Sequence, residues 1–177
     1  MSRRNRPGPW QQKSPAAQME ARLATPDDVE GLVRLARNLH AENGIGELPL
    51  SEKKVRAFID RALNGHLVII YVIGPPDDIH AAIGLVIEEG WYSDEWHLYE
   101  MFMFVDPKHR SPPGAARLLI RMAKQAADKL KLPLMVGVIS TERTEAKIRL
   151  YETELSKAGA FFLYGSRSVG NGQQDSH

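Results

Sequence analysis

The sequence predicts a single α/β domain built around a mixed sheet. Strand-like apolar runs alternate with amphipathic segments of helical period, and three of these runs follow one another with only turns between them. Strands separated by helices imply parallel crossovers, whereas strands joined by turns imply antiparallel pairs. The 177 residues, 43% of them hydrophobic, suffice for one core of this kind.

The N-terminal part of the domain is expected to form one strand and two helices. Residues 19–25 alternate apolar and polar side chains, as a short strand does. Residues 25–42 follow with an apolar face at helical spacing, and Thr25 with Pro26 behind it is a typical helix start. After a loop, residues 51–64 repeat the helical pattern behind a capping serine.

Three strands are expected in the middle of the chain. Residues 66–73, 79–89 and 97–105 are too apolar and too rich in β-branched and aromatic side chains to be surface helices. The segment GPPDD ends the first strand, and residues 90–96, GWYSDEW, are expected to form the turn between the second and the third. These turns predict an antiparallel centre for the sheet.

The C-terminal part returns to alternating helices and strands. A helix is expected over residues 114–131, a strand over 132–140, a helix over 141–155 and a last strand over 159–164. The complete expected order is therefore β-α-α-β-β-β-α-β-α-β.

The two ends of the chain differ in composition from the domain between them. Residues 1–18 form a basic, Pro- and Gln-rich arm that is expected to be disordered, and residues 166–177 a flexible tail, so the domain spans residues 19–165. The net charge of +1 gives no general attraction to nucleic acid, although the basic arm leaves a polyanion open as a partner.

Several classes of protein are disfavoured by what the sequence lacks. It contains no cysteine, which excludes disulfides, thiolate metal sites and a cysteine nucleophile. It has no secretory segment and no apolar run of the ~20 residues that span a bilayer, so we expect a cytoplasmic protein without membrane contact. Its histidines show no metal-ligand spacing, and no metal is expected.

The turn after residues 97–105 is a candidate phosphate site. It reads VDPKHRSPPGAARLLI, and a helix is expected to begin near Ser111. The free backbone N–H groups of a helix N-terminus bind anions, but Pro112 and Pro113 have no N–H to donate. The remaining donors are Ser111, Gly114, Ala115 and Ala116.

This turn resembles the acyl-CoA motif of the GNAT-type N-acetyltransferases. The motif, Arg/Gln-x-x-Gly-x-Gly/Ala after a V-x-P strand end, is matched by Val105, Pro107, Arg110 and Ala115, while its first glycine falls on Pro113. The ending RTEAKIRLY…AGAFFLY is similar to that of phage-type members of the family, with its tyrosine at Tyr151. Where the family commonly has an asparagine seven residues before that tyrosine, this sequence has Thr144.

The resemblance implies a fold and a cosubstrate. It implies an α/β (α+β mixed) fold with a mostly antiparallel sheet of six to seven strands and about four helices. It also implies acetyl-CoA as the cosubstrate, with the pyrophosphate at the turn and the pantetheine arm along the strand that ends at Val105. The expected acetyl-CoA-binding residues are Phe104, Val105, Arg110, Ser111, Gly114, Ala115 and Ala116.

The resemblance further implies two catalytic residues. Glu100 stands where several family members place a catalytic glutamate that acts as a base toward the amine, and Tyr151 matches the tyrosine that protonates the leaving thiolate. His97 and a water chain remain alternatives for the base. The implied reaction is direct acetyl transfer in a ternary complex with an amine-bearing acceptor.

Other questions stay open at this level. Acidic and aromatic residues near residues 43–52 and 90–96 are candidates for the acceptor site, and the acceptor amine is not identified. Because of the departures at Pro113 and Thr144, a catalytically silent module of the same fold that binds CoA or a protein is the alternative function. Homodimers are common in the family, so a homodimer is also an open expectation.

Overall fold

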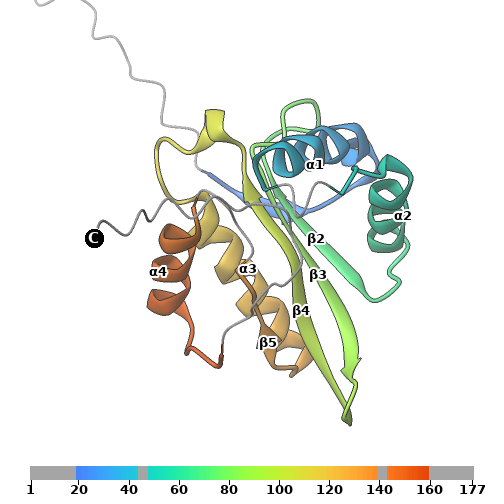
Figure 1. Cartoon of the computed structure of the whole chain (residues 1–177). Helices are drawn as coiled ribbons and strands as arrows, with labels where there is room; N and C mark the ends of the chain where they lie inside the picture. The colour runs from blue at the N-terminus through green and yellow to red at the C-terminus, as the bar shows by residue number, and fades with distance from the viewer. Residues whose placement is uncertain (1–18, 44–47, 139–142, 160–177) are drawn as a thin grey trace, which may run out of the picture.

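The computed structural model describes residues 19–43, 48–138 and 143–159. In these residues a mixed sheet is flanked by four α-helices, which confirms the predicted class (Figure 1). The elements are β1 (Ala21–Leu23), the 3₁₀ turn η1 (Pro26–Asp28), α1 (Val29–Asn43), α2 (Glu52–Leu63), β2 (Val68–Ile73), β3 (Ala81–Gly90), β4 (Ser93–Val105), the 3₁₀ turn η3 (Pro107–His109), α3 (Ala115–Leu130), β5 (Leu134–Met135) and α4 (Thr144–Glu154).

The sheet has five strands in the described residues, in the spatial order β1-β2-β3-β4-β5. The first four strands pair antiparallel, and β5 pairs parallel to β4 after the crossover through α3. The count of six to seven strands is therefore not confirmed. The last expected strand, residues 159–164, lies outside the described residues except for Gly159, which is in no strand, and so do the basic arm and the tail.

The helices cover the two faces of the sheet in pairs (Figure 1). On one face α1 and α2 bury an apolar cluster that includes Leu32, Ile59 and Phe104. On the other face α3 packs on the sheet around Leu119, and Tyr151 of α4 belongs to the same cluster. Strand β4 contributes to both clusters, so its side chains reach both faces.

The start of the first helix shows why a charged residue is fully buried there. The Asp28 carboxylate accepts hydrogen bonds from the Thr25 N–H (2.7 Å) and from the Thr25 hydroxyl (2.9 Å). Arg22 on β1 donates two more, each of 2.7 Å. These bonds to the ionised form lower the pKa of Asp28 although burial opposes them. The predicted cap at Thr25 thus also ties the helix to the edge strand.

The β3–β4 hairpin is longer than predicted. Residues 90–96 were expected to be a turn, but β4 begins at Ser93, so that only Trp91 and Tyr92 separate the two strands. Ser93, Trp96, His97 and Leu98 pair with β3, and Asp94 and Glu95 form an irregularity between the partners of Gly90 and Glu89. Strand pairing thus extends past the polar residues that suggested a turn. Trp91 is 95% exposed at the tip.

Candidate active site

A β-bulge in β4 determines which side chains reach which face of the sheet. Leu85 of β3 lies opposite Glu100, and the preceding Gly84 lies opposite Phe102, so that Met101 is an extra residue without a partner. Before the bulge, Leu98 and Glu100 therefore share the face covered by α3 and α4. After it, Phe102 faces α1 and α2, as its packing on that cluster shows.

Glu100 and Tyr151 form a buried hydrogen-bonded pair on the α3–α4 face. The Tyr151 hydroxyl donates to the Glu100 carboxylate over 2.9 Å, and both residues are 7% exposed. Burial raises the pKa of Glu100 to about 7, although the bond from Tyr151 opposes this rise. Burial also raises the pKa of Tyr151, and the negative charge of Glu100 raises it further.

Two further groups act on the Glu100 carboxylate. The Gly137 backbone N–H donates to it, and the positive charge of Lys147 lies close enough to favour its ionised form. Burial lowers the pKa of the Lys147 ammonium, while the charge of Glu100 raises it. A glutamate in these surroundings changes protonation state near neutral pH, which is the range in which a general base is most effective.

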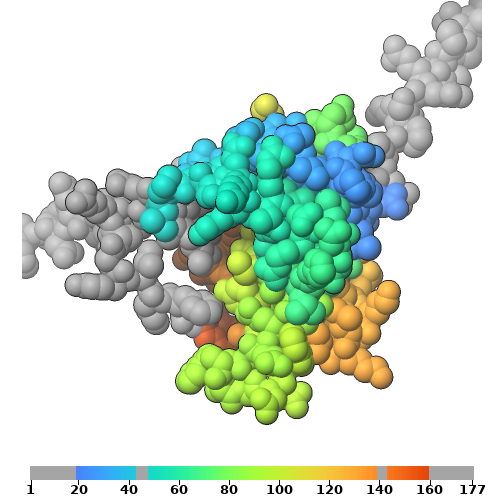
Figure 2. Space-filling model, turned by 90° about the vertical axis from the view of Figure 1, so that its right-hand side faces the viewer, coloured from blue at the N-terminus to red at the C-terminus, as the bar shows by residue number. Residues whose placement is uncertain are grey.

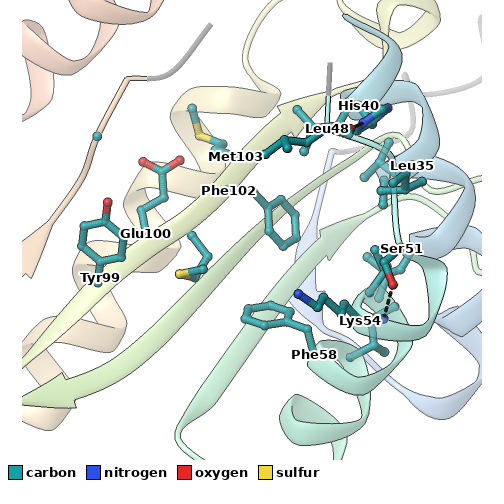
Figure 3. Close-up of a pocket in the computed structure, with 18 of the residues that line it drawn as sticks. Leu35, His40, Leu48, Ser51, Lys54, Phe58, Tyr99, Glu100, Phe102 and Met103 are labelled. Carbon is teal, nitrogen blue, oxygen red and sulfur yellow. Dashed lines mark hydrogen bonds between the residues drawn. The ribbon is translucent and has the colours of Figure 1, made fainter. Parts of the chain in front are cut away.

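Glu100 lines a cavity of about 690 Å³ that lies between β4 and the α1–α2 layer and extends past the edge of β4 to Gly137 and to Lys147 of α4. Figure 3 shows Glu100 and Phe102 on the strand side, and Lys54 and Phe58 of α2 on the opposite side. The Phe58 and Phe102 rings meet edge to face with centroids 6.1 Å apart. Figure 2 shows the α1–α2 layer, in blue to teal, above the yellow-green β3–β4 hairpin.

The lining of this large cavity is mostly apolar. Among the described residues, Glu100 is the only acidic side chain in it, and the other polar groups include Lys54, Lys147 and His40. The apolar lining is Leu32, Leu35, Ala36, Leu39, Leu48, Pro49, Leu50, Val55, Phe58, Ile59, Met101, Phe102 and Met103.

Of the two segments expected to build the acceptor site, the first contributes Leu48, Pro49, Leu50 and Ser51 to the large cavity, whereas the second contributes nothing to it. Among the acidic candidates near the first segment, Glu42 lines the small cavity, and Glu47 lies outside the described residues. The described acidic and aromatic residues of the hairpin tip, Trp91, Tyr92, Asp94 and Glu95, do not line the large cavity. His97, the alternative base, does not line it either and faces Glu88 across the hairpin at 3.6 Å. Of the two side-chain candidates for the base, only Glu100 reaches the cavity.

A smaller cavity of about 180 Å³ lies at the N-terminus of α3. It is lined by Gly114, Ala115 and Ala116, by three cationic residues, Arg110, Arg143 and Lys147, and by one acidic residue, Glu42, which forms an ion pair with Arg110. Met103 and Lys147 line both cavities, so the two adjoin.

The helix behind this small cavity begins later than expected. A start near Ser111 was predicted, but α3 begins at Ala115 with Gly114 as its N-cap, so both prolines precede the helix. Gly114 has φ 137° and ψ −25°, a conformation that a residue with a Cβ adopts only under strain. The orphan N–H groups of the first turn belong to Ala115 and the residues after it, and the prolines remove none of them.

Ser111 and Arg110 have different positions at this turn. Ser111 is exposed and does not line the small cavity. Arg110 does line it, and donates to the Val105 carbonyl (3.1 Å) and to Glu42 (2.5 Å) while its guanidinium lies over the Phe104 ring. The arginine that was expected to bind the cosubstrate is thus held by α1 and by β4.

Strand β4 is paired with β5 only in its middle, and in the described residues the two strands are not paired beyond Tyr99. Only Leu98 and Tyr99 pair with β5. The Asp106 N–H donates to the His80 carbonyl (2.9 Å), so by the alternation of antiparallel strands the backbone groups of Phe104 face β3, and those of Met103 and Val105 face the edge that β5 leaves open. Val105 is one of the two backbone positions expected at this edge, and Met103 takes the place of Phe104.

Some residues of this region had no signal in the sequence. Lys147 and Arg143 belong to the helix expected over residues 141–155, where a basic side chain is unremarkable. Helical spacing from Tyr151 does place Lys147 one turn earlier on the same face, which is the signal that was available. Phe58 and Lys54 were assigned only to the second helix, and nothing in the sequence placed that helix opposite β4.

Within the described residues, none of the helices has the length and apolarity needed to cross a bilayer. No protein-family model and no curated protein matches this sequence.

Solved structures do resemble this one. An aminoglycoside acetyltransferase, AAC(6')-Iy, in complex with a bisubstrate analogue of CoA and acetylneamine is similar with a TM-score of 0.65 at 13% identity, over 86% of this chain and 100% of the other. A predicted acetyltransferase with acetyl-CoA from Clostridium acetobutylicum has a TM-score of 0.64 at 14% identity, over 84% and 96% of the two chains. An integron cassette protein from a salt-marsh metagenome has 0.63 at 20% identity, over 85% and 90%. This chain therefore shares the fold of solved acetyltransferases.

Proposed function

We propose that this protein is a GNAT-type N-acetyltransferase that transfers an acetyl group from acetyl-CoA to a primary amine. The observation that carries the proposal is Glu100. It is a buried carboxylate with a pKa of about 7 that lines the large cavity, which in turn adjoins a cationic cavity at a helix N-terminus. One cavity offers a base and room for an acceptor, and the other offers an anion site. The shared fold with acetyltransferases supports the same reading.

The small cavity fits the pyrophosphate of acetyl-CoA. The free N–H groups at the start of α3 and the positive end of its dipole favour an anion, and no acidic residue lies in its first turn. Arg143 and Lys147 at the start of α4 add positive charge, and Arg110 adds a third cation that is paired with Glu42 of the same cavity. The small residues Gly114, Ala115 and Ala116 leave the backbone accessible to a phosphate. The open edge then offers the backbone groups of Met103 to the pantetheine arm, while the Val105 carbonyl at the same edge already accepts from Arg110.

The acetyl donor supplies a thioester, and a residue of the protein transfers one proton from the amine to the leaving sulfur. Glu100 accepts the proton that the amine loses when its nitrogen bonds to the acetyl carbon and the carbon–sulfur bond breaks. Glu100 then gives this proton to the sulfur. Because a thiol has an ordinary pKa of about 8.5, a carboxyl group with a pKa of about 7 transfers its proton to a thiolate favourably.

Tyr151 is less suited to that second transfer. Its pKa lies above the usual ~10, so it is a weaker acid than a thiol, and it lines neither cavity in the described structure. Its hydroxyl is aimed at Glu100. The acid role expected for Tyr151 stays a prediction, and the geometry supports a positioning role in which Tyr151 orients the carboxylate and limits the rise of its pKa.

The large cavity favours an acceptor amine attached to an apolar body. Polyamines and aminoglycosides carry several positive charges, and binding them calls for several carboxylates. Among the described residues lining the cavity, Glu100 is the only acid, and Lys54 and Lys147 are cations. An arylalkyl or alkyl amine places its apolar part against Phe58, Phe102 and the leucines of α1.

The test measures thiol release from acetyl-CoA with a disulfide reagent, in the presence of phenethylamine, tryptamine, spermidine or neamine. The protein contains no cysteine, so the reagent has no background from the chain. We expect the arylalkyl amines to be acetylated with the highest kcat/KM, and the Glu100→Gln variant to bind acetyl-CoA normally without turnover. Acetyl-CoA binding without turnover for any amine in the wild type would instead support a silent CoA-binding module.

A further inference from the structure

Three potential metal ligands meet at a place separate from both cavities. Asp78 and His80 lie on the loop between β2 and β3, and His109 is the last residue of η3. Their donor atoms, one per residue, all lie within 4.8 Å of one another. No lining residue of the large or the small cavity belongs to this group.

The two distances from Asp78 to the histidines match the spacing of metal ligands, although the stacked rings are not yet turned toward a common ion. The Nε2 atoms of His80 and His109 each lie 3.5 Å from the same Asp78 oxygen, Oδ2. Hydrogen bonds between nitrogen and oxygen are about 2.7–3.2 Å long, so both separations are too long for them. Ligands about 2.1 Å from a tetrahedral zinc ion lie about 3.4 Å apart, whereas an octahedral ion brings neighbouring ligands to about 3.0 Å.

The surroundings of the cluster fix the backbone of His80 and place a cation beside Asp78. The other oxygen of Asp78, Oδ1, faces the Arg34 guanidinium at 3.7 Å, and Arg34 also donates to the Asp77 carbonyl (2.7 Å). The backbone of His80 is paired on both sides, because its N–H donates to Ile73 (2.8 Å) and its carbonyl accepts from Asp106 (2.9 Å). The Asp78 carboxylate itself is half-exposed, so its oxygens are accessible to an ion from solvent.

A glycine makes room for the loop that carries two of the ligands. Gly74 has φ 105°, and a Cβ at this position would lie 2.9 Å from the His80 ring. The side chain of His80 therefore occupies space that any other residue at position 74 would fill. Behind it, the ring of His109 stacks on that of His80 with centroids 3.7 Å apart and planes inclined by 16°.

We propose that Asp78, His80 and His109 bind a zinc-type divalent transition metal, with water as the fourth ligand. Two imidazoles and one carboxylate are ligands that Zn²⁺ accepts, and a three-residue site leaves one position for water. A metal bonds to an imidazole in the plane of its ring, so the two stacked rings turn apart when the ion enters. The ion would join the β2–β3 loop to η3, one residue before Arg110 and the α3 turn.

The experiment uses the untagged full-length chain, cleared of metal with a chelator. Calorimetric titration with Zn²⁺ is expected to show one saturable site, and Co²⁺ is expected to give the intense visible absorption of a tetrahedral complex. His109→Ala and His80→Ala should each weaken Zn²⁺ binding by at least about tenfold. His66→Ala is the matched control, since His66 is exposed and lies outside the cluster. It should bind Zn²⁺ like the wild type.

Two outcomes would overturn the site. One is the absence of saturable Zn²⁺ binding by the folded wild type, and the other is binding that His66→Ala reduces as much as His109→Ala does. Asp78→Asn, which keeps both rings and removes only the carboxylate charge, guards against unfolded variants. It should lower the affinity for Zn²⁺ while the circular dichroism spectrum stays that of the wild type.

Discussion

The hydroxyl of Tyr151 on α4 donates to the carboxylate of Glu100 on β4 over 2.9 Å, between two side chains that are each 7% exposed. This bond joins residues 51 positions apart in the chain. It also couples the protonation of Glu100 to the packing of α4, because the bond favours the ionised carboxylate that burial disfavours.

The first prediction concerns the pH dependence of turnover. With an arylalkyl amine at saturation, kcat should rise about tenfold per pH unit below pH 7 and level off above it, because only the ionised Glu100 accepts a proton. Glu100→Gln should lower kcat by at least about 100-fold and flatten the profile. A Gln variant with the wild-type profile would show that another group is the base.

The second prediction concerns stability, which should fall with rising pH whereas kcat rises. The folded pKa of Glu100, about 7, lies above its ordinary value of 4.5, so the folded state holds the proton more tightly and the free energy of unfolding falls as the pH rises from about 4.5 to 7. The loss amounts to about 3 kcal/mol. Glu100→Gln, which carries no charge, should therefore be more stable than the wild type at pH 8 and similar at pH 4.5. Urea unfolding at both pH values measures this, and equal stability at pH 8 would contradict it.

The third prediction separates positioning from packing at Tyr151. Tyr151→Phe removes one hydroxyl and keeps the ring in its cluster. Without the bond that favours the carboxylate, the pKa of Glu100 rises further, so the midpoint of the kcat–pH profile should move to higher pH and kcat at pH 7 should fall. A lower kcat with an unmoved midpoint would indicate a role other than orienting Glu100.

The fourth prediction concerns the close approach of Phe102 to β3. A Cβ at Gly84 would overlap the Phe102 ring, which also lines the large cavity. Gly84→Ala should cost about 1–3 kcal/mol of unfolding free energy and raise the KM for the acceptor, since the ring must move. Gly159→Ala is the control, because nothing lies within 4 Å of its Cβ position. Equal effects on stability in the two variants would contradict the prediction.

The fifth prediction isolates the turn before α3. Gly114 and Gly65 both have positive φ, and a Cβ at either would meet nothing within 4 Å, so Ala at each position strains only the backbone. Both substitutions should lower stability by about 1–3 kcal/mol. Only Gly114→Ala should also weaken acetyl-CoA binding, measured by calorimetry on the folded fraction. Unchanged affinity in that variant would place the pyrophosphate elsewhere.

Much of this fold was predictable because its helices and strands have strong periodic patterns. The alternation and helical spacing that predicted β2 and α3 come from burial on one face, and burial is what the tertiary structure preserves. The periodic pattern over residues 114–131 predicted the extent of α3 to within one residue at each end, whereas the start near Ser111 suggested by the turn is four residues early. The prolines suggested a first helical turn, but the backbone of Gly114 is not helical, so the helix begins only after it.

The site was predictable only where a short segment contains it. Glu100, Arg110 and Ala115 lie within 16 residues of one strand and turn, and all three line one of the two cavities. The partners that give them their surroundings, such as Lys147 and Glu42, come from helices far along the chain. Their proximity depends on how α1 and α4 pack on opposite faces of the sheet, and no local pattern records that.

The bulge at Met101 makes the length of β4 more important than the identity of its middle residue. Up to the bulge, the even-numbered side chains Leu98 and Glu100 point to the α3–α4 face of the sheet. After the bulge the alternation is shifted by one residue, so the even-numbered Phe102 points to the α1–α2 face. Substituting Met101, which is 52% exposed, leaves the alternation of side chains on both sides of the bulge unchanged. Deleting Met101 would join the two segments into one regular alternation, so that either Glu100 or Phe102 would have to point to the wrong face of the sheet. The carboxylate and the Phe102 ring thus stay on their opposite faces only as long as β4 keeps this one additional residue between them.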